Sequence, residues 1–549
     1  MPPGRHLHRT MAPPMPRYDE PDVLIIGAGA SGAAAAWYLA GHGFRVTCLE
    51  QGGWFKADGQ LGLDWESRRF GDLNPDPNVR RNVWDYPINN RESAITPLMV
   101  NGVGGSTVMW GAHFPRYHPS DFRTRTLDGV GDDWPLSYAE LEPWYDLNDR
   151  MIGVAGLAGD PAFPPKPPRP LPPVAIGRSG RTVAAGFDRL GWHWWPSDGA
   201  IVTRPYGPGR HACNNCGPCG MGCPIGARSS ADVSYWPIAL RLGVDLRTGC
   251  RVREIAVDAW GRARGALYYE GEHGLREQRA PIVVIACNGI GTPRLLLNSV
   301  SPQFPHGLAN RSGLVGKNLM FHAYSTVWGV FDELLDGHAG PGGNQIVSHE
   351  FYETDHSRGF VRGFQLQVVR GGGPMGTALG HSRLLPRGEA LPWGRHHHRT
   401  FDERFGHLVN VSMNGEDLPE TINEVALDPH LTDSDGIPAP LVRYRLSENS
   451  RKMIDFAVAR SKEVLEAAGA RQTFVPNTLP MAGFHLMGTC RMGDHPYGSV
   501  VDRWGRSHDV PNLYIVDGSL FVTSGGVNPT PTLQALALRT AAHIAGQTA

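Results

Sequence analysis

The chain of 549 residues lacks any apolar run long enough to cross a bilayer, which takes about 18 to 20 residues. Its most apolar segments are interrupted by Gly, Arg or His within a few positions. The chain also has almost no net charge, because 52 Lys and Arg residues nearly balance 53 Asp and Glu residues and leave −1. A neutral chain has no long-range field that attracts a polyanion. We therefore expect a protein that is not transmembrane and does not bind nucleic acid.

The first 20 residues lack the apolar core of a secretory signal. They are basic at first and rich in proline, with no run of seven apolar residues. We expect a cytoplasmic protein, or a periplasmic or otherwise extracytoplasmic one if a partner subunit with its own signal carries the folded chain out.

Cysteine is scarce, with eight residues in the whole chain, whereas 69 glycines and 46 prolines are present. A chain of this size buries its own core and needs no disulfide scaffold. The high glycine and proline content indicates a loop-rich globular protein. Four of the eight cysteines nevertheless lie within eleven residues, at Cys213, Cys216, Cys219 and Cys223.

The first ordered pattern is DVLIIGAGASGAAAAWYLAGHGFRVTCLE, residues 22–50. It predicts a strand over 23–26, a glycine turn, a helix that includes Ser31, and a second strand that ends at Glu50. Gly27, Gly29 and Gly32 have the G-x-G-x-x-G spacing, which permits a tight turn, close approach of a pyrophosphate, and close packing of helix on strand. Glu50 follows at the distance expected for an acid that binds ribose hydroxyls. The alternative is an ordinary glycine turn.

Two further segments are suited to holding a cofactor. Residues 101–113 (NGVGGSTVMWGAH) combine glycines with Ser106 and Thr107, a composition that wraps main-chain amides around a flat ring or phosphate; a simple glycine-rich turn is the alternative. Near the C-terminus, a strand that ends at Asp517-Gly518 presents a short acid and free amides. We expect this strand at the same sheet edge as the first turn, so that the nucleotide-binding domain is discontinuous.

The remaining patterns predict a second domain. Segments 325–331, 363–369 and 407–413 alternate as in an antiparallel sheet, and residues 447–470 form an amphipathic helix capped by Ser447 or Asn449. A polyproline-like connection spans 161–177. The expected fold class is α/β, a Rossmann-like dinucleotide-binding domain with a substrate domain built on a mostly antiparallel sheet. The expected dinucleotide-binding parts are 20–120, 236–320 and 476–549, with a substrate-side segment over 121–235 and the substrate domain over 321–475.

Four motifs in this order resemble the glucose-methanol-choline (GMC) oxidoreductases, which oxidise alcohols with FAD. They are GAGASG with Glu50, NGVGGSTVMWG, ACNGIGTPRLLLNS, and FHLMGTCRMG followed by VDGSLFVTSGGVNPTPT. The resemblance implies that His485 is the base that takes the hydroxyl proton and that Asn528 orients the hydroxyl. A neutral imidazole near pH 7 suits this role.

The glycine patterns and the resemblance together define the candidate FAD-binding residues. These are Gly27, Gly29, Ser31, Gly32, Glu50, Asn101, Gly104, Gly105, Ser106, Thr107, Trp110, Gly111, Asp517, Gly518, Asn528 and Thr530. Some relatives attach FAD covalently through a histidine in the glycine segment. The matching position is Met109, so we expect non-covalent FAD, with His113 as a nearby alternative for attachment.

The four clustered cysteines have the spacing C-x2-C-x2-C-x3-C-P, which is typical of an iron-sulfur site. A 3Fe-4S and a 4Fe-4S cluster are both consistent with it, and a structural zinc site, disulfides or free thiols are alternatives. The segment resembles the catalytic subunits of bacterial FAD-dependent sugar dehydrogenases, in which Cys213, Cys219 and Cys223 have counterparts. Asn214 replaces a second cysteine of that pattern and Cys216 is additional.

The expected activity is therefore oxidation of a CH–OH group of a sugar, glycoside or polyol by hydride transfer to FAD. Electrons would pass through the cysteine cluster to a cytochrome or quinone acceptor, with a small partner subunit possible. An oxygen-dependent oxidase and a non-redox flavoprotein lyase are the alternatives.

Two further groups of residues, one of histidines and one of tryptophans, are weaker candidates for a functional site. We expect His396–His398 to lie in a loop and to bind no metal, because adjacent side chains point in different directions. For Trp192, Trp194 and Trp195, packing in the core is the more common outcome, with stacking on a sugar as the alternative.

Overall fold

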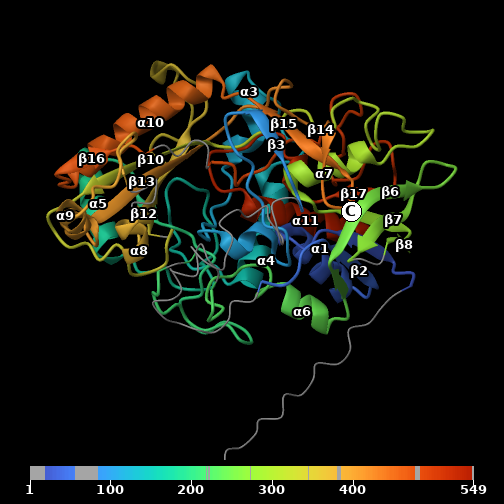
Figure 1. The fold of residues 1–549 in the computed structure, drawn as a ribbon, viewed down its shortest axis with the longest axis horizontal. Helices are drawn as coiled ribbons and strands as arrows, with labels where there is room; N and C mark the ends of the chain where they lie inside the picture. Colours follow the sequence, from blue (N-terminus) through green and yellow to red (C-terminus); the bar gives the residue numbers. More distant parts are fainter. Residues whose placement is uncertain are drawn as a thin grey trace, which may run out of the picture.

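The structure is a computed structural model that describes residues 19–55, 85–217, 219, 223–271, 274–343, 345–379, 385–476 and 482–546. The proline-rich residues 1–18 lie outside the described part. The molecule is built on two large sheets, which Figure 1 places on opposite sides of the view.

A five-stranded sheet confirms the predicted nucleotide-binding start. Its strand order is β17-β9-β1-β2-β5 and every pairing is parallel. The strands are β1 (Val23–Ile26), β2 (Val46–Glu50), β5 (Asp245–Thr248), β9 (Ile282–Ile285) and β17 (Leu513–Ile515). Strands such as β1 and β9 are continuous apolar runs because a parallel sheet is covered on both faces. Three distant parts of the chain thus form one sheet, as predicted.

Helices pack around this sheet. The helix α1 (Ala30–Gly41) follows the glycine turn, and α11 (Thr530–Ile544) packs against both α1 and α4 (Tyr138–Ile152). The helix α6 (Trp236–Arg241) also contacts α1, and α7 (Asn288–Asn298) follows β9. The alanine-rich face of α1 lets these helices approach closely.

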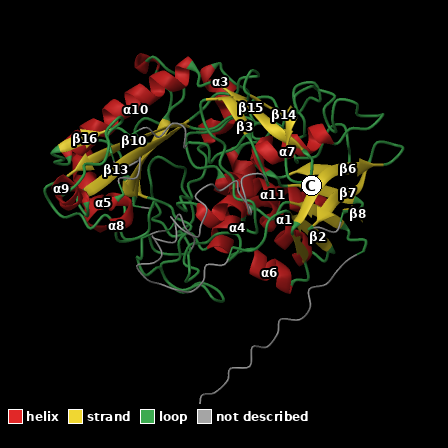
Figure 2. Ribbon diagram, in the orientation of Figure 1, coloured by secondary structure: helices red, strands yellow, loops and turns green. Residues whose placement is uncertain are grey.

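A six-stranded sheet with the order β16-β10-β13-β12-β11-β4 forms the second layer, and all its pairings are antiparallel. The strands are β4 (Trp195–Pro196), β10 (Ala323–Val330), β11 (Ile346–Ser348), β12 (Phe364–Arg370), β13 (Leu408–Gly415) and β16 (Gln472–Phe474). The helices α10 (Glu448–Ala467) and α5 (Gly177–Leu190) pack against this sheet (Figure 2). The Ser447 hydroxyl caps α10 by accepting a hydrogen bond from the Ser450 amide, as predicted.

Two three-stranded sheets complete the fold. One joins β14 (Glu424–Thr432), β15 (Pro438–Tyr444) and β3 (Asn89–Ser93), and the other joins β6 (Cys250–Val257), β7 (Ala263–Glu270) and β8 (Leu275–Arg279). Because β3 pairs with β15, two segments that the sequence assigns to different domains share a sheet. The shorter helices are α3 (Thr124–Asp128), α8 (Pro374–Ala378) and α9 (Arg395–Arg404), and 3-10 turns span Gly105–Met109 (η1), Pro119–Arg123 (η2), His356–Arg358 (η3) and Gly518–Leu520 (η5).

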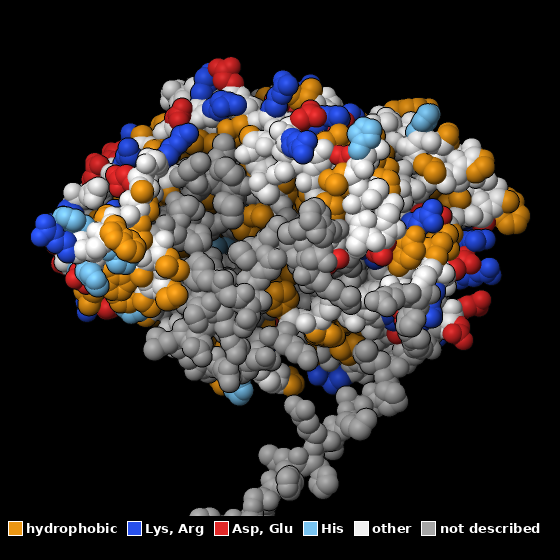
Figure 3. Space-filling view, in the orientation of Figure 1, with side chains coloured by type: hydrophobic (Ala, Val, Ile, Leu, Met, Phe, Trp, Pro, Cys, Tyr) orange, Lys and Arg blue, Asp and Glu red, His pale blue; other side chains and the backbone are white. Residues whose placement is uncertain are grey.

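The surface agrees with the balanced charge of the sequence, since basic and acidic side chains are interspersed on the face that Figure 3 shows. Among the described residues, no helix combines the length and the apolar content needed to cross a bilayer.

The prediction of a loop at His396–His398 is wrong, because these residues lie in α9. In the core, Trp192 and Trp194 pack against the hydrophobic cluster beside the antiparallel sheet. Trp195 lies in β4 and donates a hydrogen bond from Nε1 to the Leu157 carbonyl. The more common outcome for tryptophan, packing, therefore holds here.

Candidate active site

A cavity of 1260 Å³ is lined by both large sheets. It begins at the glycine turn after β1, passes the glycine segment and reaches the face of the antiparallel sheet. Of the predicted site residues, it is lined by Gly27, Gly29, Ser31, Glu50, Asn101, Gly105, Ser106, Thr107, Trp110, Gly111, His485, Asp517, Gly518, Asn528 and Thr530, together with Cys216 and Cys219.

The turn after β1 requires glycine at two of the predicted positions. Gly27 has a φ of 102°, and a Cβ there would lie 2.4 Å from the carbonyl oxygen of Ala286. A Cβ at Gly32 would lie 2.0 Å from the Gly27 carbonyl oxygen, so this position lets α1 pack directly against the turn. No side chain caps the N-terminus of α1 at Gly29. Its free amides and the positive end of the helix dipole suit a pyrophosphate.

Glu50 lies at the end of β2, where its carboxylate borders the cavity. The carboxylate accepts hydrogen bonds from the amides of Ala28 and Gly52, each at 2.9 Å. These two bonds fix the orientation of the side chain at the edge of the cavity. The arrangement fits a ribose with two hydroxyl groups.

The glycine segment packs its backbone against the first turn. Gly104 has a φ of 96°, and a Cβ at Gly105 would lie 2.9 Å from the Cα of Gly29. Thr107 donates a hydrogen bond to the Gly104 carbonyl at 2.6 Å and accepts one from the Ala231 amide. Gly104 and Gly32 therefore shape the turns and do not line the cavity.

Two polar groups of the cradle remain without a partner among the described residues. They are the buried Nε1 of Trp110 and Nδ1 of His113, and both side chains line the cavity. A buried donor without an acceptor is costly. Met109 also lines the cavity, next to these two side chains.

The C-terminal segment closes the cradle. The Asp517 carboxylate is buried and accepts hydrogen bonds from the Thr292 hydroxyl at 2.5 Å and the Ser519 amide at 2.8 Å. Burial raises the pKa of Asp517, and these hydrogen bonds oppose the rise. Thr530 starts α11, whose N-terminus no side chain caps. A second helix N-terminus thus borders the cavity.

His485 has a partner that the sequence reasoning missed, His322 at the start of β10. The two Nδ1 atoms lie 2.7 Å apart, and the rings are nearly perpendicular at 88°. Burial lowers the pKa of His322 to about 4, so its ring is neutral near pH 7. Burial, followed by the neighbouring His322 and His113 rings, lowers the pKa of His485 well below its usual value.

The hydrogen bonds of His322 determine which nitrogen of His485 is basic. His322 Nε2 faces the carbonyl oxygens of Gly525 at 2.9 Å and Ser524 at 3.2 Å. Carbonyls only accept, so this nitrogen carries the proton and His322 Nδ1 is an acceptor. His485 therefore donates from Nδ1, which leaves an unprotonated Nε2 as the base.

Asn528 lines the same cavity from the loop before α11. Its Oδ1 accepts a hydrogen bond of 2.5 Å from Nε2 of Gln367 on β12. The donor Nδ2 of Asn528 has no partner among the described residues. Gln367, also missed from the sequence, lines the cavity as well.

The four clustered cysteines all lie in the described part of the chain. Cys219 Sγ accepts a hydrogen bond from the Gly342 amide at 3.2 Å, and Cys223 Sγ accepts one from the Arg228 amide at 3.4 Å. Burial, and then the neighbouring thiols, raise the pKa of Cys216 to about 11. Among the described residues, no three cysteine sulfurs lie within 4.8 Å of one another.

A buried arginine connects the cysteine loop to the glycine segment. Arg228 donates to the carbonyls of Trp110 at 3.2 Å and Val108 at 2.5 Å, and also to the Cys219 carbonyl. The cysteines and the cradle are therefore adjacent parts of one cavity wall.

The residues present fit FAD. The two glycine turns expose backbone where a phosphate approaches, Glu50 suits the ribose, and Trp110 offers an unpartnered donor. The fold and the site define a flavin-dependent oxidoreductase, with the His485 imidazole in the same cavity.

Comparisons with known proteins agree. The family profile described as GMC oxidoreductase matches residues 202–324 and 419–537, and the profile described as FAD dependent oxidoreductase matches residues 22–60. The chain is 44% identical to 2-methyl-1,2-propanediol dehydrogenase of Mycolicibacterium austroafricanum, over 96% of this chain and 95% of that protein. It belongs to the GMC oxidoreductase family and is an FAD-dependent enzyme that acts on CH–OH groups of the alcohol and sugar type.

Other similar proteins support the same family. The chain is 32% identical to the fructose dehydrogenase large subunit of Gluconobacter japonicus, over 95% of this chain and 97% of that protein. It is 31% identical to 6'''-hydroxyparomomycin C oxidase of Streptomyces lividus, over 96% and 92%. The solved structure of pyridoxine 4-oxidase from Mesorbium loti has the same fold, with a TM-score of 0.66, 18% identity, and coverage of 96% of this chain and 100% of that one.

Proposed function

We propose that the chain oxidises a hydroxyl-bearing carbon of a diol, polyol or sugar. The observation that carries this proposal is the polar face of the antiparallel sheet, which lines the cavity opposite the FAD cradle. Its side chains come from alternate positions of three strands: Tyr324 and Thr326 of β10, Gln367 of β12, and Asn410, Ser412 and Asn414 of β13. Most of these groups bind one another, but a substrate with a single hydroxyl on an apolar body would leave the Asn414 amide unpaired.

The register places these groups in rows across the sheet. Ser412 is opposite Thr326 on one side and Gln367 on the other. The Thr326 and Ser412 hydroxyls lie 2.9 Å apart, and Ser412 donates to Asn410 Oδ1. The Asn414 amide is buried, with 3% of its surface exposed, and has no side-chain partner among the described residues. The face thus offers donors and acceptors to a second and third hydroxyl.

The names of the relatives support the same substrate class, because they specify a 1,2-diol, fructose and a hydroxylated aminoglycoside. Bound FAD supplies the acceptor for the hydride. His485 removes the hydroxyl proton at Nε2, and Asn528 donates a hydrogen bond from Nδ2 to the oxygen as it becomes negative.

We further propose that Cys213, Cys216, Cys219 and Cys223 hold an iron-sulfur cluster, which supplies one-electron transfer to an external acceptor. No three of these sulfurs lie within 4.8 Å of one another among the described residues, so the proposal rests on the C-x2-C-x2-C-x3-C-P spacing of the sequence. Arg228 donates hydrogen bonds to the carbonyls of both Trp110 and Cys219, so the flavin cradle and the cysteine loop are adjacent. This proximity supports electron transfer between them. A partner subunit is consistent with the large-subunit name of one relative.

The test is anaerobic reduction of the purified enzyme. We expect a 1,2-diol, polyol or sugar to bleach the flavin absorbance, and His485→Ala to slow this step by about 10² to 10⁴-fold. We also expect about three or four irons per flavin, lost in Cys219→Ser and kept in the matched control Cys48→Ala. No bleaching by any alcohol would favour a lyase, and flavin without iron would contradict the cluster.

A second candidate, an oxygen-dependent oxidase, is favoured by the name of the Streptomyces relative. The oxidase and the dehydrogenase differ in the electron acceptor, which is oxygen for the oxidase and an external one-electron acceptor for the dehydrogenase. Peroxide formed in air as fast as an artificial one-electron acceptor is reduced would support the oxidase.

A further inference from the structure

We propose that a chain of side chains from Asp160 through His349, Gln365 and Gln367 fixes the amide of Asn528 with its donor Nδ2 toward the substrate oxygen. The inference rests on the proposed function, because it assigns positioning residues for the same reaction. Gln367 is the positioning residue that touches Asn528. The other members act through it.

The direction of each amide follows from its neighbour. Gln367 Nε2 donates to Asn528 Oδ1 at 2.5 Å and to Gln365 Oε1 at 2.6 Å. Gln365 then presents Nε2 to His349 Nε2 at 2.8 Å. An amide nitrogen only donates, so His349 Nε2 is an acceptor. Reversing the side-chain amide of Asn528 would therefore require the amides of Gln365 and Gln367 to reverse as well.

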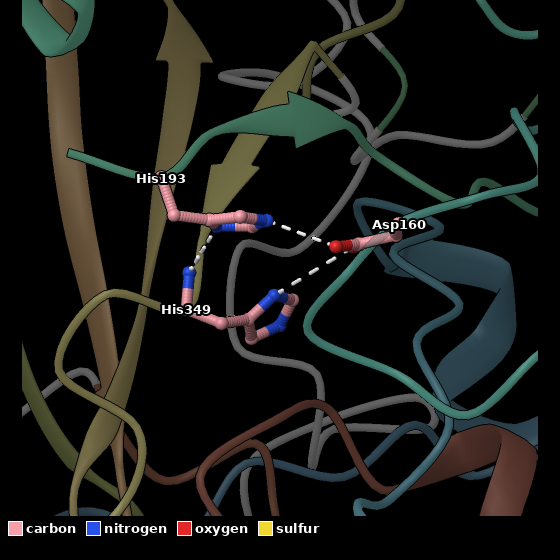
Figure 4. Close-up of side chains that lie close together, drawn as sticks. All are labelled: Asp160, His193 and His349. Carbon is pink, nitrogen blue, oxygen red and sulfur yellow. Dashed lines mark hydrogen bonds and ion pairs between the residues drawn. The ribbon is translucent and has the colours of Figure 1, made fainter. Parts of the chain in front are cut away.

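The charge of Asp160 favours the matching tautomer of His349, although the buried Nδ1 makes no hydrogen bond among the described residues. Because Nε2 accepts, the neutral ring carries its proton on Nδ1, which faces Asp160 Oδ2 at 3.9 Å (Figure 4). Burial lowers the pKa of His349 well below its usual value, with further lowering by His118, His193 and Lys166. The ring is therefore neutral.

The Asp160 carboxylate is ionised. Burial alone would raise its pKa, but the hydrogen bonds from His193 and from the Ala162 amide lower it overall. His193 Nδ1 accepts a hydrogen bond from the His349 amide at 3.1 Å, so its Nε2 donates to Asp160 Oδ1 at 2.9 Å. An anion thus faces the Nδ1 proton of His349 and stabilises that tautomer.

The same three side chains present a second possibility. Their ligand atoms lie within 4.8 Å of one another, and two histidines with one carboxylate are a common set for a divalent metal. A metal-bound histidine donates from its other nitrogen. Here the other nitrogens of His193 and His349 both accept hydrogen bonds. The observed directions therefore favour the hydrogen-bonded cluster over a metal site.

The orientation of Asn528 matters for the reaction. With Nδ2 toward the cavity, the amide stabilises the negative charge that develops when His485 takes the proton. In the reversed orientation, Oδ1 would compete with His485 for that proton.

A double-mutant cycle tests the proposal in the FAD-loaded enzyme. Glutamate offers only acceptors, so Gln367→Glu should bind Asn528 Nδ2 and turn Oδ1 to the cavity. We expect the rate of flavin reduction at saturating substrate to fall about 10²-fold, as when a donor to an oxyanion is removed. In an Asn528→Ala background the same change should cost less than about twofold. Asp160→Asn should show the same dependence on Asn528 with a smaller loss.

Several outcomes would overturn the proposal. One is an equal loss of the flavin-reduction rate in the enzyme with Asn528 and in the Asn528→Ala background, which would indicate a structural role. Another is an unchanged rate in Gln367→Glu. A stoichiometric divalent metal that His193→Ala releases would overturn the tautomer assignment. FAD content and melting temperature are measured for every variant to identify misfolding. Because Gln367→Glu also adds a charge, the cycle is repeated with Gln367→Leu. Failure of the proposed function is separate, because the unaltered enzyme would then show no flavin reduction by any alcohol.

Discussion

His322 connects the catalytic base to the loop that carries Asn528. Its Nε2 is bound to the Gly525 carbonyl and its Nδ1 to His485. One side chain therefore sets the tautomer of the base and also holds the adjacent loop. A charge on His322 would destroy this arrangement, and its burial prevents that charge near pH 7.

Replacing His322 with alanine should slow flavin reduction and change its pH dependence. His485 is active when unprotonated, so a pKa well below 6.5 extends the activity plateau into acid. Removing His322 takes away a neighbour that lowers this pKa, and the acid limb should move to higher pH. A profile of kcat/KM between pH 5 and 8 measures the shift. His396→Ala, on α9, is the control, and an unmoved limb in His322→Ala would contradict the role.

The sequence predicted the two residues of the proposed catalytic pair but not the residues that contact them. His485 and Asn528 lie in motifs that resemble those of a family, and both line the cavity. His322 and Gln367 are 163 and 161 residues away from the partners they bind. The only local signal for Gln367 is the polar alternation of 365 and 367 within an apolar strand, which indicates a sheet face turned toward a polar cavity.

At the scale of elements, the β1–α1 unit was predicted to the residue, since strands β1 and β2 have the expected ends. Continuous apolar runs, a glycine turn and an acid are local signals. No local pattern predicts the pairing of β3 with β15 or the two-residue strand β4, because both depend on contacts between distant segments. The helix at α9 was missed because its three histidines have low helix propensity and a Pro and a Gly come shortly before it, although its arginines favour a helix.

The glycine turn of this unit supports a matched comparison. Gly27 and Gly43 both have positive φ, but only a side chain at Gly27 meets another atom, the Ala286 carbonyl oxygen. We expect Gly43→Ala to cost about 1 kcal/mol and to keep FAD. Gly27→Ala should abolish FAD binding. Flavin absorbance per protein after purification distinguishes the two, and equal FAD content would show that the close contact at Gly27 is unimportant.

At the scale of the whole molecule, a buried carboxylate lies where the main layers meet. Asp417 accepts hydrogen bonds from the Tyr444 hydroxyl of β15 at 2.8 Å and the Ser450 hydroxyl of α10 at 3.0 Å. Its amide is also bound to Ser524, in the loop before α11. Burial raises the pKa of Asp417 to about 7, and the hydrogen bonds oppose the rise.

The stability of the molecule should therefore depend on pH through Asp417. The folded state keeps this proton up to about pH 7, whereas an unfolded aspartate loses it near pH 3.9. Between these values the group's contribution to the free energy of unfolding falls by about 1.4 kcal/mol per pH unit as pH rises, and it is constant above pH 7. Asp417→Asn should remove this slope. Urea unfolding at pH 5.5, 6.5 and 8 compares the two proteins, and parallel curves would contradict the assignment.

The parallel sheet takes strands from three parts of the chain, and β17 with Asp517 and Thr530 comes last. During synthesis, a nascent chain that has reached β9 has made the Glu50 end of the cradle but has no base and no final strand. We therefore expect stable binding of FAD only after β17 has joined the sheet, and a chain that ends before β17 should purify without flavin.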